Sequence, residues 1–218
     1  MKLVLFNSGR PGLMRDDGIV DITELVSSIT HTSGQQAMKA IITNMSSIKS
    51  DLEEFERSGT VIDFSDANIE APLPAPNKIL CMGGNFTEFG HRKPGPMWGF
   101  LKASDAVIGP NETVILPPDD ANIFHHEAEL VLVFGKAGTN ISEDEAFEYV
   151  FGYTCGVDVS ARMPAVPNST PPDFQAWRGV SAHKSHTTFA PMGPAIVTKD
   201  EILDPQNLLV QLRVDGQL

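Results

Sequence analysis

The stretch FHHEAELVLVFG, from Phe124 to Gly135, and the stretch GVDVSAR, from Gly156 to Arg162, decide how this chain is expected to fold. Both are runs of apolar, β-prone residues with acids near one end, and each is predicted to form a strand. Side chains two residues apart on a strand point to the same face, so Glu127 and Glu129 are expected to face the same way. Asp158 adds a third carboxylate on the second strand.

These three carboxylates predict a site for a hard divalent cation. Like charges on half-buried strands repel one another and are costly to desolvate unless a cation neutralises them. Ligands that offer only oxygen suit Mg²⁺, Mn²⁺ or Ca²⁺ better than zinc. A Glu-x-Glu pair by itself is more typical of a solvated edge strand, and the third acid is what favours the metal site.

Several motifs, in this order along the chain, resemble the fumarylacetoacetate hydrolase family. They lie at Asn77–Phe86, Phe100–Lys102, His125–Lys136, Phe151–Arg162 and Ala182–Pro205. They are similar to the family's entry segment, its F-x-K strand, its E-x-E strand, its GYT…D-x-S-A-R segment, and its lysine followed by a GP strand. The order is more specific than any single motif. The resemblance extends from about Asn77 to Leu218.

The resemblance implies a metal site surrounded by cations that hold substrate oxygens. The implied metal ligands are Glu127, Glu129 and Asp158, with Mg²⁺ or Mn²⁺ as cofactor and Ca²⁺ as a possible alternative. The implied substrate-binding residues are Arg162, Lys184 and Lys102, and Lys184 is also implied in catalysis. A planar guanidinium suits a carboxylate, and an ammonium suits a developing enolate.

The general base departs from the family pattern. Phe89 stands where the family has a histidine, and Arg92 stands where it has a glutamate. A phenylalanine cannot transfer a proton, so His91 is predicted as the catalytic base, with His125 and His126 as alternatives. His125 shares the face of Glu127 only if the strand is regular.

The predicted function is cleavage of a C–C bond in a 2-oxo or 1,3-diketo acid by a metal-dependent hydrolase of acylpyruvate or fumarylacetoacetate type. The alternatives are an oxaloacetate-type decarboxylase, a keto–enol isomerase, and a non-catalytic, truncated remnant of the family. Decarboxylation and isomerisation need no activated water, so the altered base position shifts weight toward them. A small-molecule substrate and a homodimer are expected.

The chain is predicted to be mainly β with α, a family-like mixed β-sheet roll or sandwich beside a small α+β part. Residues 1–70 form the predicted amino-terminal subdomain, 71–77 a proline-rich linker, and 78–218 the catalytic core. Apolar spacing predicts helices at Gln35–Met45 and Ile48–Phe55.

The carboxyl end is expected to be incomplete. The run Asn207–Val214, which alternates apolar and polar residues from Val210 onward, predicts a half-buried strand, and Asp215-Gly216 is a strong hairpin signal with little chain after it. By resemblance, family members continue beyond this point with more strands, so the core is expected to lack part of its sheet.

Composition narrows the possible partners and compartment. The formal net charge of −12 argues against nucleic acid and anionic membrane surfaces. No apolar run in the sequence approaches the ~20 residues that span a bilayer. Cys81 and Cys155 lie in apolar runs and are predicted to be buried free thiols, which favours a reducing compartment such as the cytoplasm.

Overall fold

The computed structural model describes residues 1–27, 32–87, 93–117, 123–162 and 183–218. Its strands are β1 (Lys2–Phe6), β2 (Arg10–Arg15), β3 (Gly18–Asp21), β4 (Val61–Ile62), β5 (Ile69–Glu70), β6 (Ile79–Gly83), β7 (Trp98–Lys102), β8 (Val107–Ile108), β9 (Ile123–Phe134), β10 (Val150–Arg162) and β11 (Ala190–Thr198). Its α-helices are α1 (Thr23–Val26), α2 (Gly34–Ser58) and α3 (Ala146–Tyr149). Short 3₁₀ turns are η1 (Phe64–Asp66), η3 (Ser104–Ala106), η4 (Glu143–Glu145), η5 (Lys199–Glu201) and η6 (Pro205–Asn207).

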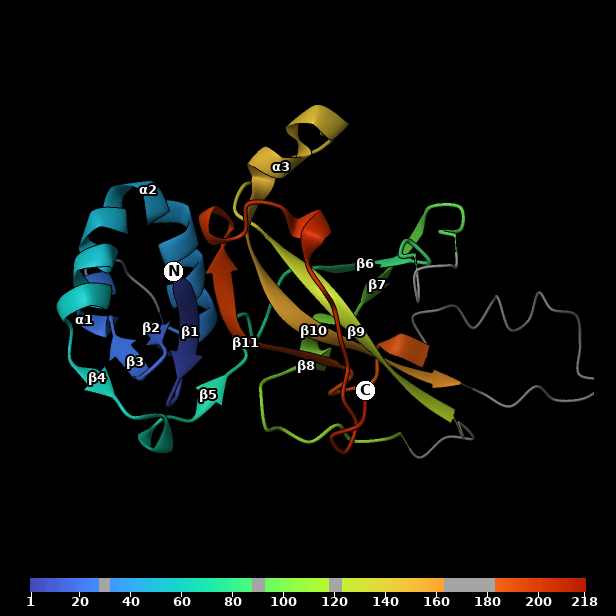
Figure 1. Ribbon diagram of the computed structural model, residues 1–218, viewed down its shortest axis with the longest axis horizontal. Helices are drawn as coiled ribbons and strands as arrows, with labels where there is room; N and C mark the ends of the chain where they lie inside the picture. The colour runs from blue at the N-terminus through green and yellow to red at the C-terminus, as the bar shows by residue number, and fades with distance from the viewer. Residues whose placement is uncertain (28–31, 88–92, 118–122, 163–182) are drawn as a thin grey trace, which may run out of the picture.

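One sheet runs through most of the described chain. Its main path is β4-β3-β2-β1-β11-β10-β9, with β5 on β1 and β8 on β11 (Figure 1). The β8–β11 pair is parallel and the others are antiparallel, so the sheet is mixed. β6 and β7 form a separate antiparallel pair. The predicted mainly β architecture with a mixed sheet is therefore confirmed.

Helix α2 covers the amino-terminal strands (Figure 1). Its fully buried side chains Met38, Ile41 and Leu52 pack in one cluster with residues such as Leu3 and Leu5 of β1. The Ser33 side chain begins the helix by accepting a hydrogen bond from the Gln36 N–H at 3.3 Å. The sequence predicted two helices here, but one continuous helix forms because nothing between the two apolar stretches breaks its backbone hydrogen bonding.

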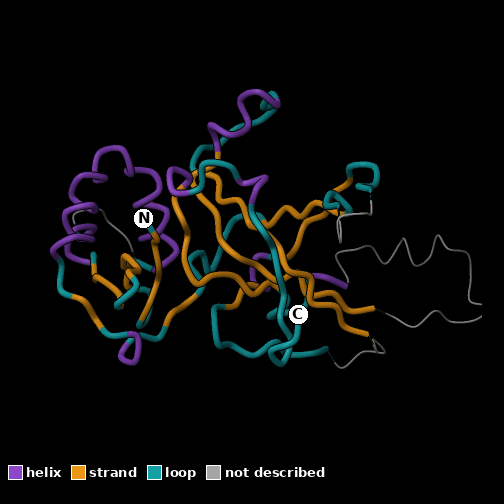
Figure 2. Tube along the Cα trace, viewed as in Figure 1, coloured by secondary structure: helices purple, strands orange, loops and turns teal. Residues whose placement is uncertain are grey.

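The predicted linker at residues 71–77 has no regular secondary structure. The strands on its two sides are nevertheless joined, since β1 pairs with β11 through Lys2↔Val197 and Leu3↔Ile196. Figure 2 shows the strands continuing from the amino-terminal part into the core. The division into domains stays a prediction, and the two sides of its boundary share a sheet.

The prediction of a strand at residues 207–214 was wrong. Residues 208–213 have no regular secondary structure, and the backbone pairs only at an isolated bridge between Val214 and Gln217. Alternation of side chains permits a strand, but a strand also needs a partner backbone for its hydrogen bonds. The predicted turn does form, with positive φ at Asp215 (49°) and Gly216 (78°).

No helix among the described residues is long and apolar enough to cross a membrane.

Replacing Ile196 tests how much the hydrophobic core contributes to the stability of the shared sheet. Its side chain is fully buried in the cluster with Leu3 and Met38. Replacing it by alanine removes buried methyl groups and leaves a cavity, so Ile196→Ala should lower the free energy of unfolding by about 2–4 kcal/mol. Urea denaturation followed by circular dichroism measures the change. The control Leu203→Ala, at an exposed position, should stay within about 0.5 kcal/mol of the parent.

Candidate metal centre

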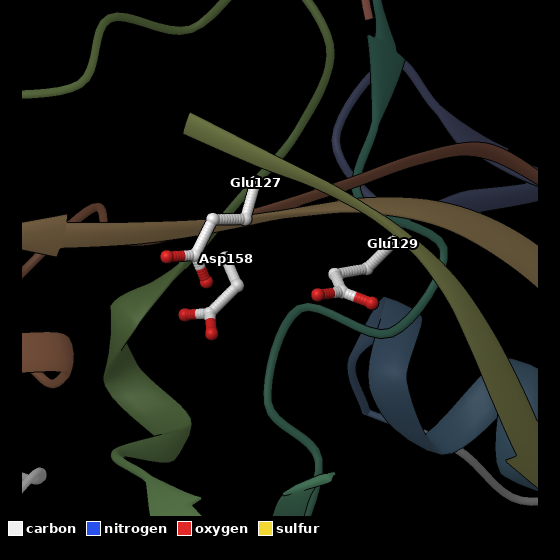
Figure 3. A group of neighbouring side chains, drawn as sticks. All are labelled: Glu127, Glu129 and Asp158. Carbon is white, nitrogen blue, oxygen red and sulfur yellow. The ribbon is translucent and has the colours of Figure 1, made fainter. Parts of the chain in front are cut away.

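The antiparallel pairing of β9 with β10 brings the three predicted metal ligands together. Asp158 lies directly opposite Glu127, and Gly156 lies opposite Glu129. Opposed residues of an antiparallel pair place their side chains on the same face of the sheet. One oxygen from each of Glu127, Glu129 and Asp158 lies within 4.8 Å of the others (Figure 3). The predicted cluster therefore exists as a geometric unit.

The opposite face of β10 explains why its acid points toward the cluster. Val157, Val159 and Ala161 alternate with Asp158 and pack with the buried ring of Phe189. This apolar packing leaves the other face for polar groups, because successive side chains on a strand point to opposite faces. Asp158 is only 8% exposed even so.

Lys184 bridges two of the acids. It belongs to a short helical turn just before β11, and its side chain is only 7% exposed. Its Nζ donates to Glu127 Oε2 at 2.8 Å and to Asp158 Oδ2 at 2.5 Å. A lysine in a polar segment could have been a solvated loop residue, but here it is a buried counter-charge to the carboxylates.

Lys102 approaches Asp158 from β7. Its Nζ donates to Asp158 Oδ1 at 2.5 Å and to the Val159 carbonyl at 3.1 Å, and its side chain is 2% exposed. Burial lowers the pKa of this ammonium, and the hydrogen bond to Asp158 opposes that shift. Both oxygens of Asp158 are thus held by lysines. Three formal negative charges and two positive ones leave the five-residue cluster net negative.

Of the predicted bases, His125 lies beside the cluster. Its Nδ1 is 3.8 Å from Glu127 Oε1, so it shares the face of that glutamate as a regular strand requires. His126 is exposed on the same strand. His91, together with Phe89 and Arg92, lies outside the described residues.

Arg162 is the last residue of β10 and pairs with Ile123, but its side chain lies outside the described part of the chain.

Two further residues near the centre were missed by the sequence analysis. Phe100 lies under Lys184, with the ammonium 5.0 Å from the ring centroid. Its cross-strand partner Cys81 interacts electrostatically with Asp158 and Glu129. Alternation along β7 was the available signal, because it places Phe100 on the face of Lys102.

The residues present suit a hard divalent ion. Three carboxylates are the donor set that Mg²⁺ and Mn²⁺ prefer. Around an octahedral ion, neighbouring oxygens lie about 3 Å apart and opposite ones about 4 Å, so oxygens within 4.8 Å of one another need only small side-chain adjustments. Two ammonium groups already bind here, which indicates that the cluster attracts cations.

The sequence profile of the fumarylacetoacetate (FAA) hydrolase C-terminal family matches residues 78–218. This chain belongs to that family. The match covers β6 to the carboxyl end and includes every predicted metal ligand.

Curated and solved relatives agree with this assignment. The chain is 36% identical over 164 residues to the rat (Rattus norvegicus) protein named oxaloacetate tautomerase Fahd2a, mitochondrial, which covers 72% of this chain and 49% of the relative. Maleylpyruvate hydrolase from Sphingobium sp. SYK-6, solved with manganese(II) and pyruvate, is 29% identical with a TM-score of 0.77, covering 94% of this chain and 70% of the other. A fumarylacetoacetate hydrolase from Exiguobacterium antarcticum is 26% identical with a TM-score of 0.72, covering 100% of this chain and 73% of the other.

The family and its fold, as predicted from the motifs, are thereby confirmed. The chain spans about half the length of the curated relatives it matches. The roles of the individual site residues stay predictions.

Measurements of Mn²⁺ affinity distinguish the predicted metal ligands from the lysines beside them. Asp158→Asn should weaken Mn²⁺ binding by about 100-fold or more, because it removes a charged ligand from the centre of the cluster. Lys184→Met should not weaken it, because this variant removes a competing cation. Calorimetric titration measures both, with Asp144→Asn in the exposed η4 turn as the matched control. Wild-type affinity in Asp158→Asn would contradict the ligand assignment.

The cysteines differ from the prediction that both are buried. Cys155 is exposed and Cys81 is half-buried. An apolar run did not ensure burial of Cys155, because alternate side chains of a strand face opposite ways.

Alkylation should distinguish the two thiols. Burial raises the pKa of the Cys81 thiol to about 11, with the Asp158 charge as the next cause. The thiolate is the reactive form, so iodoacetamide at pH 8 should label Cys155 first, and Cys81 labelling should accelerate toward pH 11. Peptide mass spectrometry reports both rates. Equal rates at pH 8 would contradict the prediction.

Proposed function

We propose that this chain forms the divalent-metal centre of an enzyme that interconverts the keto and enol forms of a 2-oxo acid. The observation that carries the proposal is the cluster of Glu127, Glu129 and Asp158 with the buried ammonium of Lys184 placed between two of them. A bound divalent ion would supply Lewis-acid polarisation of a chelating 2-oxo acid. The activity of the whole protein is a proposal, because the chain matches only part of its relatives.

Lys184 is the residue that we propose to hold the reacting oxygen. Its ammonium is buried and already oriented by Glu127 and Asp158. Enolisation moves a proton from carbon 3 to the base and leaves negative charge on the carbonyl oxygen, and a proton delivered to that oxygen then completes the enol. A pre-oriented cation in a site of low exposure stabilises that charge without reorganising.

We propose different roles for Lys102 and Arg162. The sequence predicted that Lys102 binds substrate, but its ammonium donates two hydrogen bonds to β10, at Asp158 and Val159. We propose that Lys102 chiefly positions Asp158. Arg162 keeps its predicted role as the fork for the substrate carboxylate, since it follows Asp158 on the same strand.

The base is proposed to be a histidine. His91 stays the predicted base. Of the two alternatives, His125 and His126, His125 is preferred because its Nδ1 lies 3.8 Å from Glu127 Oε1. Phe89 at the usual histidine position disfavours activation of water. This departure, and the tautomerase name of the rat relative, are why isomerisation takes precedence over the hydrolysis that the sequence predicted first.

Hydrolysis of a C–C bond is the second candidate function. The observation that favours it is the likeness to maleylpyruvate hydrolase, whose structure holds manganese(II) and pyruvate. The same structure supports Mn²⁺ as a proposed cofactor beside Mg²⁺. Decarboxylation and a non-catalytic remnant stay as the remaining alternatives.

Oligomeric state and compartment also stay proposals. A homodimer is proposed from the resemblance. The cytoplasm was predicted from the cysteines, whereas the name of the rat relative places that protein in mitochondria.

Oxaloacetate provides the test of the proposed reaction. The chain loaded with Mn²⁺ or Mg²⁺ should accelerate the keto–enol interconversion of oxaloacetate, followed by the absorbance of the enol. EDTA should abolish the activity and added Mn²⁺ should restore it. Glu129→Gln should lower kcat/KM by about 100-fold or more, because it removes a charge that holds the metal.

The control is Glu143→Gln, which changes an exposed glutamate of η4 and should leave kcat/KM unchanged. Activity that survives EDTA would contradict the proposal. Faster hydrolysis of an acylpyruvate than interconversion of oxaloacetate would favour the second candidate. Metal binding without either activity would favour the remnant.

A further inference from the structure

The inner face of β7 carries two aromatic rings beside the metal centre. Trp98, Phe100 and Lys102 alternate along this strand, so their side chains share one face. Leu101 points to the other face and is 52% exposed. The strand therefore has an inner row of three residues and an outer residue that serves as an internal comparison.

The row leads away from the carboxylates. Lys102 contacts Asp158, and the Phe100 ring lies 5.0 Å from the Lys184 ammonium. The Trp98 and Phe100 ring centroids are 5.6 Å apart, with the rings tilted by 30°. Since a strand advances about 3.3 Å per residue, Trp98 lies about 13 Å along the strand from Lys102.

Gly83 on β6 makes room for the indole. It is the cross-strand partner of Trp98, and a Cβ built on it would lie 2.0 Å from Trp98 Cζ2. The indole therefore lies against the backbone of β6, where any larger residue would displace it. Trp98 is nevertheless 46% exposed, so about half of the residue stays accessible.

We propose that Trp98 and Phe100 form a subsite for the distal group of the substrate, and that this group is planar and apolar, an aryl or alkenyl substituent. The inference rests on the proposed function, because the chelating end of the 2-oxo acid must be anchored at the divalent ion that the three acids would hold, with its reacting oxygen at Lys184. A group on carbon 3 or carbon 4 then extends along the inner face of β7. Flat apolar groups gain the most binding free energy there, because they stack on aromatic rings and cover their exposed surface.

The structural alternative is that Trp98 only stabilises the β6–β7 pair. Packing against Gly83 is consistent with that reading. It does not account for a row that starts at the charge cluster, with Lys102 on Asp158, and leaves its outermost ring half exposed. The two readings differ in whether Trp98 affects ligand selectivity.

The experiment compares two probes that share the chelating end. Benzylidenepyruvate carries an arylalkenyl group, and pyruvate carries only a methyl group. Calorimetry on the Mn²⁺-loaded chain gives the Kd of each probe for the parent, Trp98→Ala, Trp98→Phe and Leu101→Ala. The Kd for Mn²⁺ itself shows whether each variant keeps an assembled site.

The parent should bind benzylidenepyruvate about tenfold more tightly than pyruvate, given the strength of aromatic contacts. Trp98→Ala should erase most of that preference while pyruvate and Mn²⁺ affinities stay unchanged. Trp98→Phe should keep most of it, and Leu101→Ala should keep all of it.

Failure of the subsite and failure of the proposed function would give different results. If pyruvate binds in a metal-dependent way but the parent shows no preference, or Trp98→Ala keeps it, the subsite is wrong and the proposed function stands. If neither probe binds to the Mn²⁺-loaded parent, the proposed function fails and the subsite fails with it. An equal loss in Leu101→Ala would assign the effect to strand stability and overturn the subsite.

Discussion

Mutual repulsion of three carboxylates is the constraint on which the rest of the site depends. The register of β9 on β10 places Asp158 opposite Glu127, so the acids cannot avoid one another. Charges this close, with Asp158 buried and the two glutamates half-buried, are costly unless cations compensate them. Lys184 from the turn before β11 and Lys102 from β7 provide that compensation. Four segments far apart in the sequence thus converge on one charge cluster.

The sheet that carries the acid cluster also links the amino-terminal part of the chain to the stability of the site. β10 lies between β9 and β11, and β11 pairs on its other side with β1. The α2 cluster, with Ile41 and Leu52 fully buried, stabilises the sheet that holds Asp158 in place. Residues with no contact to the site can therefore affect it through the strand order.

β7 joins two kinds of chemistry on one face. Its Lys102 end belongs to the charge cluster, and its Trp98 end is aromatic and half exposed. A 2-oxo acid has the same division, with an anionic chelating end and a distal group of variable polarity. Under the proposed function, the same strand face helps to position Asp158 at one end and selects among distal groups at the other.

The family, the mainly β class and the identity of the three acids could be predicted from the sequence alone, because they depend on local alternation and on motifs in a fixed order. The convergence of those acids depends on the register of β9 on β10. The sequence also predicted the turn at Asp215-Gly216, since hairpin turns are encoded by adjacent residues. It failed for residues 208–213, where a strand requires a partner, and for Cys155, whose face depends on packing. The contact of Lys102 with Asp158 and the position of Phe100 under Lys184 became visible only in the folded chain. Such contacts depend on register between distant strands, and no local pattern specifies which distant backbone a strand will pair with.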